Sequence, residues 1–234
     1  MISILNSFRN VVVFQALNYI NMKILKMLIL PVVIFSAVSN ACSQNDPFDG
    51  ITDEKVLPML KRLPYNHGGM NVPDVDGRVL YDIIVENNYQ RGIEIGTSNG
   101  YSGLWQGLAF KKTGGKLITI EIEEKRAKEA RENFRKAGLD DVIDSRINDA
   151  FKEIPKIDGE FDFIFLDAWK PDYIKFYNLL YPRLKPGGTL TAHNVRGSSY
   201  QMQDFLDAIQ NNPDLETTIN TASRAGVSIS VKKH

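Results

Sequence analysis

The sequence has no second cysteine and no excess of charge of either sign, and each of these absences excludes a structural feature or a class of partner. Cys42 is the only cysteine, so the chain cannot form an internal disulfide. The 28 basic and 28 acidic side chains cancel. Because phosphate contacts need clustered lysine and arginine, we expect no nucleic-acid partner.

The N-terminal apolar run is too short to cross a bilayer, which takes about 20 residues in a helix. It covers residues 27–38, follows the basic stretch MKILK at 22–26 and precedes the small residues SNACS at 39–43. This order of basic, apolar and small residues is typical of a secretory signal.

We therefore predict a signal segment over residues 1–41, with residues 1–21 arising from an upstream start codon. Cys42 occupies the position that a lipoprotein signal acylates, whereas Ser39 and Ala41 also suit an ordinary signal peptidase. Both processing routes stay open, and a lipid on Cys42 is the only membrane contact that we expect. The expected location is the bacterial cell envelope, with the cytoplasm as the alternative.

The remaining chain divides into a polar, acidic tether at residues 42–57 and a domain at 58–234. Within the domain, residues 58–73 contain three prolines and should be mostly irregular. Apolar strands and amphipathic helices then alternate. We predict helices near 77–87, 101–109, 124–137, 171–180 and 199–211, and strands near 91–95, 117–121, 143–148, 161–167, 188–193, 215–221 and 227–232.

This alternation predicts an α/β fold of the Rossmann-like type, a seven-stranded sheet with helices on both faces. The last two strands are joined by the turn at 223–226 without a helix. We therefore expect a mostly parallel sheet that ends in an antiparallel C-terminal hairpin at its edge.

A glycine-bounded loop joins the first predicted strand to the next helix, in the sequence RGIEIGTSNGYS at 91–102. Glycine allows a sharp turn and a close approach of a ligand, and the helix offers free N–H groups. Only Gly96 and Gly100 lie in the loop, whereas a pyrophosphate fingerprint has three glycines. Glu121 ends the next strand, where the hydroxyl groups of a bound ribose would need a hydrogen-bond acceptor. The loop resembles motif I of class I S-adenosylmethionine methyltransferases.

Polar residues also end two neighbouring strands later in the chain. Asp167 closes the apolar run FDFIFLD at 161–167, and Lys170 follows three residues on. The next strand ends at His193 and Asn194. Because a desolvated carboxylate needs a cation or donors nearby, we expect these side chains to form one site.

Several motifs together resemble the cation-dependent O-methyltransferases, the group of the catechol and caffeoyl-CoA enzymes. They are LDAWK at 166–170, LKPGG at 184–188, AHNV at 192–195, ITIE at 118–121 and MNV at 70–72. The resemblance extends from about residue 66 to residue 195. It implies S-adenosylmethionine as cofactor and a small hydroxylated, catechol-like acceptor.

The resemblance also implies roles for individual residues. The loop would hold the methionine part of the cofactor, Glu121 the ribose and residues 148–150 the adenine, while Trp169 would pack beside that ring or shape the substrate mouth. The implied cofactor-binding residues are Asn71, Val72, Glu94, Gly96, Thr97, Ser98, Gly100, Tyr101, Ser102, Glu121, Asn148, Asp149, Ala150, Asp167 and Trp169.

His193 departs from the family pattern, which has a metal-binding aspartate at that position. Asp167 and Asn194 match two further metal ligands, and Lys170 matches the proton acceptor. Mg²⁺ prefers oxygen ligands, so a set of Asp167, His193 and Asn194 suits a softer divalent ion better. Alternatively the metal is absent and His193 acts as the general base.

We therefore expect an S-adenosylmethionine-dependent O-methyltransferase, with Lys170 or His193 as base. Two alternatives stay open: metal-independent methylation of another nucleophile, and an exported ligand-binding protein with a methyltransferase fold. Oligomeric state is also open, with a homodimer as one alternative.

Overall fold

The structure, a computed structural model, describes residues 46–63 and 71–234. The predicted signal segment at 1–41, Cys42 and Met70 of the MNV motif lie outside these residues. Among the described helices, none is both long and apolar enough to span a bilayer.

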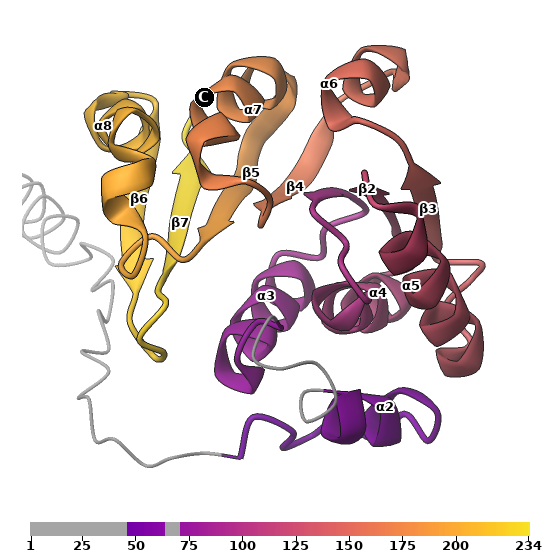
Figure 1. Cartoon of the computed structure of the whole chain (residues 1–234). Helices are drawn as coiled ribbons and strands as arrows, with labels where there is room; N and C mark the ends of the chain where they lie inside the picture. Colours follow the sequence, from indigo (N-terminus) through magenta and orange to yellow (C-terminus); the bar gives the residue numbers. More distant parts are fainter. Residues whose placement is uncertain (1–45, 64–70) are drawn as a thin grey trace, which may run out of the picture. The chain divides into compact units, whose positions relative to one another are not determined.

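Seven strands form one sheet in the order β3-β2-β1-β4-β5-β7-β6 (Figure 1). The strands are β1 (Arg91–Ile95), β2 (Lys116–Glu121), β3 (Ile143–Ile147), β4 (Phe161–Leu166), β5 (Leu184–His193), β6 (Leu215–Asn220) and β7 (Val227–Lys232). The first five are parallel, and β7 pairs antiparallel with both β5 and β6. The predicted fold class, including the C-terminal hairpin at the edge, is confirmed.

Helices cover both faces of this sheet. In Figure 1, α3, α4 and α5 lie on one side and α6, α7 and α8 on the other. Their bounds are α3 (Asp74–Glu86), α4 (Tyr101–Thr113), α5 (Glu124–Ala137), α6 (Ala150–Glu153), α7 (Tyr173–Leu180) and α8 (Gln203–Asn211).

The central strand β4 explains why the sheet needs two helical layers. Phe163 and Phe165 pack in the core on the α3–α5 side, whereas Ile164 and Leu166 pack in the core on the α7–α8 side. Successive side chains of a strand point to opposite faces. A strand that is apolar at every position is therefore stable only when both faces are covered.

The segment before α3 is more ordered than predicted. Helix α2 (Val56–Arg62) contains Pro58, so the expectation of irregular chain was wrong for residues 58–62. Pro58 is the third residue of the helix, and the N–H that proline lacks would have had no intrahelical partner there. Val56 and Leu60 are fully buried and fix the helix to the core.

The described part of the expected tether, residues 46–57, packs against α3 and α4. The Phe48 ring stacks on Trp105 with centroids 5.6 Å apart. Arg78 Nη1 donates to the carbonyl oxygen of Asp49 over 2.6 Å, and Ile51 is buried. This stretch is part of the folded domain.

Several predicted boundaries shift for local reasons. The predicted helix starts at 171 and 199 are 3₁₀ turns, Lys170–Asp172 and Ser199–Gln201, that precede α7 and α8. Helix α6 was not predicted because it has only four residues; the Asp149 side chain caps it by accepting the Phe151 N–H over 2.9 Å. Strand β5 begins at Leu184, four residues earlier than expected.

Candidate active site

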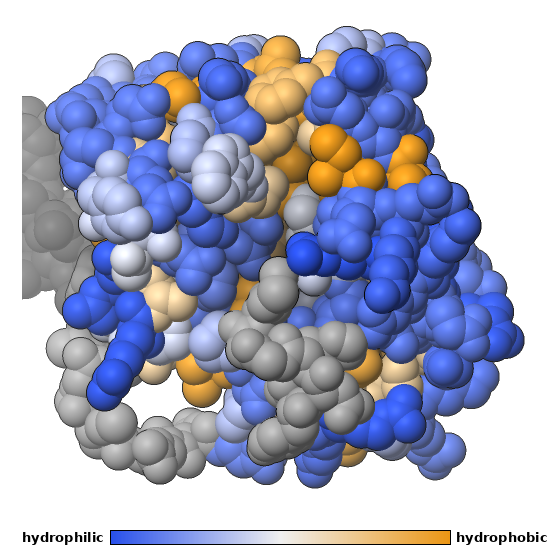
Figure 2. Space-filling model, in the orientation of Figure 1, coloured by the Kyte–Doolittle hydropathy of each residue, from blue (hydrophilic) through white to orange (hydrophobic). Residues whose placement is uncertain are grey.

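A cavity of about 550 Å³ opens where β1, β2, β4 and β5 end. Sixteen of the residues predicted from the sequence line it: Asn71, Val72, Gly96, Thr97, Ser98, Tyr101, Ser102, Glu121, Asn148, Asp149, Ala150, Asp167, Trp169, Lys170, His193 and Asn194. Glu94 and Gly100 lie off its wall. Figure 2 shows a mainly hydrophilic face that a group of hydrophobic residues beside α6 interrupts.

The glycines of the loop after β1 are required by its backbone. Gly96 has φ +101°, and a Cβ there would come within 2.3 Å of the carbonyl oxygen of Asp167. Gly100 has φ +87°, and a Cβ there would meet the Phe134 ring at 2.8 Å. At Gly96 the loop therefore packs directly against the end of β4, and a residue with a side chain would not fit there.

Glu121 ends β2 with both carboxylate oxygens held by backbone donors. The Ser98 N–H donates to Oε2 over 2.7 Å, and the Glu123 N–H donates to Oε1 over 3.0 Å. These bonds fix the carboxylate at the cavity wall without adding a positive side chain. Its remaining lone pairs are available to hydroxyl donors.

Glu94 does not reach the cavity. Its side chain is fully buried and is surrounded by polar groups. Ser102 Oγ and Gln106 Nε2 each donate to Oε1 over 2.6 Å, and the Thr119 hydroxyl donates to Oε2. Burial raises the pKa of Glu94 to about 7, although these three donors oppose the shift. The residue ties the start of α4 to β1 and β2.

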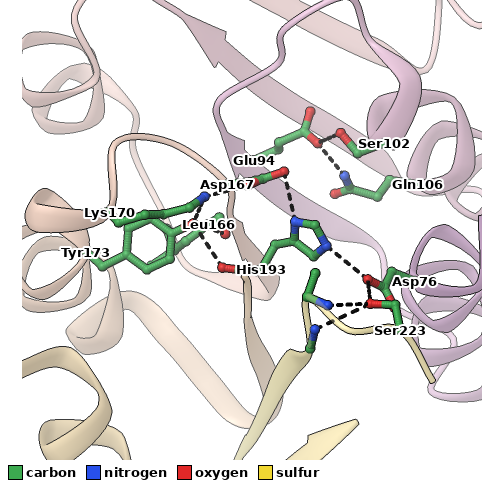
Figure 3. A network of polar contacts seen from close by, with 12 residues as sticks. Asp76, Glu94, Ser102, Gln106, Leu166, Asp167, Lys170, Tyr173, His193 and Ser223 are labelled. Carbon is green, nitrogen blue, oxygen red and sulfur yellow. Dashed lines mark hydrogen bonds and ion pairs between the residues drawn. The ribbon is translucent and has the colours of Figure 1, made fainter. Parts of the chain in front are cut away.

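Asp167 and Lys170 form one unit at the end of β4 (Figure 3). Lys170 Nζ donates to Asp167 Oδ1 over 2.8 Å and to the Tyr173 hydroxyl over 2.9 Å. The Tyr173 hydroxyl in turn donates to the Leu166 carbonyl oxygen over 3.0 Å. Burial opposes the charge on Asp167, but the facing His193 and Lys170 outweigh it and hold the pKa of Asp167 below its ordinary value.

His193 lies between two carboxylates (Figure 3). Its Nε2 lies 2.9 Å from Asp76 Oδ2, and its Nδ1 lies 3.4 Å from Asp167 Oδ2, an ion-pair distance without hydrogen-bond geometry. Ser223 Oγ donates to the same Asp76 oxygen over 2.6 Å. Burial alone would lower the pKa of His193, but Asp167 and Asp76 outweigh it and raise the pKa to about 9.

Sequence reasoning missed Asp76 and Ser223. A signal for Asp76 exists, because it precedes the buried residues Leu80 and Ile84 at helical spacing and therefore lies on the buried stripe of α3. An acid on such a stripe needs a buried partner. Nothing comparable marks Ser223, which lies in the turn between β6 and β7.

The sequence-predicted metal ligands do not suit a divalent ion in this arrangement. Asp167 already binds the Lys170 ammonium, and both His193 nitrogens face carboxylates. Asn194 lines the cavity beside them. Within residues 46–63 and 71–234, no group of three or more His, Cys, Asp or Glu side chains is arranged to hold a metal.

Part of the cavity wall is aromatic. Phe151 and Phe176 stack with centroids 4.5 Å apart and both line the cavity, although the sequence did not single them out. Trp169 also lines it, with 68% of its surface exposed. A planar ligand therefore has flat apolar surfaces to pack against.

Comparisons with known proteins agree with this geometry. A sequence model of a family described as O-methyltransferase matches residues 50–226. A catechol O-methyltransferase of Niastella koreensis is 36% identical over 107 residues, 44% of this chain and 48% of that protein. A protein described as a putative caffeoyl-CoA O-methyltransferase of Arabidopsis thaliana is 31% identical over 142 residues, 59% of this chain and 61% of that protein. The matches thus span less than two thirds of either relative.

Solved structures share the fold. An O-methyltransferase from Bacillus cereus, crystallised in complex with SAH, is 25% identical with a TM-score of 0.68. The superposition covers 78% of this chain and 92% of that chain.

Proposed function

Because the chain belongs to the O-methyltransferase family, we propose that it transfers a methyl group from S-adenosylmethionine to a hydroxyl group of a small aromatic, catechol-like acceptor. The observation that carries the proposal is that one cavity joins the glycine loop, Glu121, and the Asp167–Lys170 unit. A cofactor-binding loop and a proton-handling pair thereby open onto the same space.

The residues of the loop fit a nucleoside with an amino-acid tail. Gly96 allows the tail to approach the backbone, and the fixed carboxylate of Glu121 is placed to accept from ribose hydroxyls. Phe151 and the chain at 148–150 offer a flat surface for a base. S-adenosylmethionine supplies a methyl group on a positively charged sulfur that leaves as a neutral thioether.

Lys170 is the residue that we propose for the acceptor hydroxyl. Among the contacts of the described residues, its ammonium uses two N–H groups, on Asp167 and Tyr173, so a third can hold an acceptor oxygen. For transfer, the ammonium first releases its third proton to water; the resulting amine then takes the proton of the acceptor hydroxyl as the oxygen attacks the methyl carbon, which restores the ammonium. His193 is less suited as base because both of its nitrogens face carboxylates.

The aromatic wall supports an aromatic acceptor. Trp169 is exposed at the cavity, and Phe176 stacks on Phe151 inside it. Because Phe151 serves the base of the cofactor, the Trp169 indole, one residue before Lys170, is the surface that we assign to the acceptor ring. Positioning of this kind supplies a large part of the acceleration of a two-substrate reaction.

Calorimetry and a transfer assay test the proposal together. We expect wild type to bind S-adenosylmethionine and its demethylated product, and Glu121→Gln to weaken both by about tenfold because a charge-assisted hydrogen bond is lost. Glu124→Gln, which changes an exposed carboxylate nearby, is the matched control and should bind like wild type. Lys170→Met should lower kcat for catechol methylation by a factor of about 10²–10⁴.

Two outcomes would contradict the proposal. Failure of wild type to bind either nucleoside would remove the enzyme function altogether. The second outcome is that the protein binds the nucleosides but mass spectrometry detects no methyl transfer to any hydroxyl probe. That result would favour a different nucleophile or a ligand-binding protein.

A further inference from the structure

The starting observation is that His193 bridges two carboxylates from different parts of the chain. Asp76 comes from α3 and Asp167 from the end of β4, while His193 ends β5. A neutral imidazole has only one N–H, so one of its nitrogens would point a lone pair at a carboxylate. The geometry therefore matches a ring that carries a proton on both nitrogens.

Asp76 needs that positive charge. Its side chain is 1% exposed, and within the described part of the chain its Oδ1 has no hydrogen-bond partner. The partners of its Oδ2 are His193 and the Ser223 hydroxyl. A buried carboxylate with one neutral donor and no cation would be strongly unfavourable.

The second carboxylate, Asp167, is also paired with positive groups. Asp167 has the Lys170 ammonium 2.8 Å from Oδ1 and His193 3.4 Å from Oδ2. Its two oxygens therefore each face a cation. Figure 3 shows the chain of groups from Lys170 through Asp167 and His193 to Asp76 and Ser223.

A divalent ion would disrupt this network of contacts both at His193 and at Asp167. To act as a ligand, His193 would have to lose a proton and turn a nitrogen away from a carboxylate, which would leave Asp76 without a cation. To bind Asp167, the ion would have to lie close to the Lys170 ammonium. Mg²⁺ also prefers a set of oxygen ligands, and His193 offers none from its side chain.

We propose that the imidazolium of His193, held between Asp76 and Asp167, takes the place of a divalent cation in this site, so that methyl transfer by this chain requires no metal ion. The inference rests on the proposed function for its catalytic consequence. Asp76 is then a positioning residue, which acts through His193.

Metal binding is the direct test, because it can be read without any activity. Mn²⁺ is titrated into the full chain, with and without S-adenosylhomocysteine, and free Mn²⁺ is followed by electron paramagnetic resonance. We expect wild type to show no site tighter than about 1 mM. The double variant Asp76→Asn/His193→Asp removes the pair and restores an oxygen set with Asp167 and Asn194, so it should bind one Mn²⁺ at least about tenfold more tightly.

Other outcomes would overturn the inference. One Mn²⁺ bound per wild-type chain and lost in His193→Gln would show that the imidazole is a ligand. A folded double variant, checked by thermal melting, that gains no Mn²⁺ affinity would show that the pair is not what excludes the ion. If the double variant does not fold, the wild-type titration decides alone.

The transfer assay separates this inference from the proposed function. Methylation of catechol by wild type should be unchanged when EDTA is added and when Mg²⁺ or Mn²⁺ is restored. Activity that EDTA abolishes and metal restores would refute the inference while leaving the proposed function intact. A chain without activity under every condition would refute the proposed function, and the Mn²⁺ titration would still judge the inference.

Discussion

Replacement of Glu94 by glutamine should change how the stability of the protein depends on pH. Burial raises the pKa of Glu94 to about 7 in the folded chain, from an ordinary value of 4.5. The folded state therefore binds the proton more tightly than the unfolded state does between these two values. Stability contributed by this proton is present at low pH and is lost as the pH rises toward 7.

The size of the loss follows from the shift. One pKa unit corresponds to about 1.4 kcal/mol, and integration from about pH 5 to about pH 7 gives a loss of about 2 kcal/mol in the free energy of unfolding. Glutamine is uncharged and can keep the network. Its oxygen can accept from Ser102 and Gln106, and its amide can donate to Thr119, whose own hydroxyl then donates to Thr97.

Urea unfolding of wild type and Glu94→Gln at several pH values measures the effect. The wild type should lose about 2 kcal/mol more than the variant over that interval. The contribution of His193 to the stability of the protein also falls with rising pH, because its pKa is raised to about 9 from 6.5. Its contribution is the same in both chains and cancels in the difference.

An exposed carboxylate provides the control. Glu160→Gln changes a side chain on the surface and should follow the wild-type curve. Equal pH slopes for wild type and Glu94→Gln would refute the reasoning, because they would mean that Glu94 has the same proton affinity in the folded and unfolded chains.

Three further substitutions test other parts of the site. Gly96→Ala should abolish cofactor binding in calorimetry, because its Cβ would come within 2.3 Å of the Asp167 carbonyl oxygen; retained affinity would contradict the packing of the loop. Ser223→Ala removes one donor to Asp76 and should lower the free energy of unfolding by about 1 kcal/mol; an unchanged urea midpoint would show that the bond contributes nothing. Trp169→Ala, at an exposed side chain, should raise KM for catechol while changing stability by less than about 0.5 kcal/mol; an unchanged KM would place the acceptor elsewhere.

The sequence predicted the sheet and the cavity wall well because their signals are local. Apolar alternation marks the strands, and glycine marks the turn after β1. The acids Glu121 and Asp167 directly follow or end apolar strands, so their place at the carboxyl edge of a parallel sheet could be inferred. Local rules failed at Pro58, where a helix tolerates proline in its first turn.

The role of His193 could not be read from its neighbours in the sequence. Its partner Asp76 lies 117 positions earlier, and Ser223 lies 147 positions after Asp76. Sequence reasoning therefore left His193 open between metal ligand and base. The folded chain brings it between two carboxylates, and this contact is the basis of our proposal that a charged ring fills neither role.

The amino-acid sequence by itself determined the order of the strands and of the longer helices, the glycine loop and the acids at the strand ends. These features depend on side-chain periodicity and on backbone preferences over a few residues. Only the tertiary structure decided which charges meet, because the folding of distant segments places Asp76 and Asp167 on either side of His193.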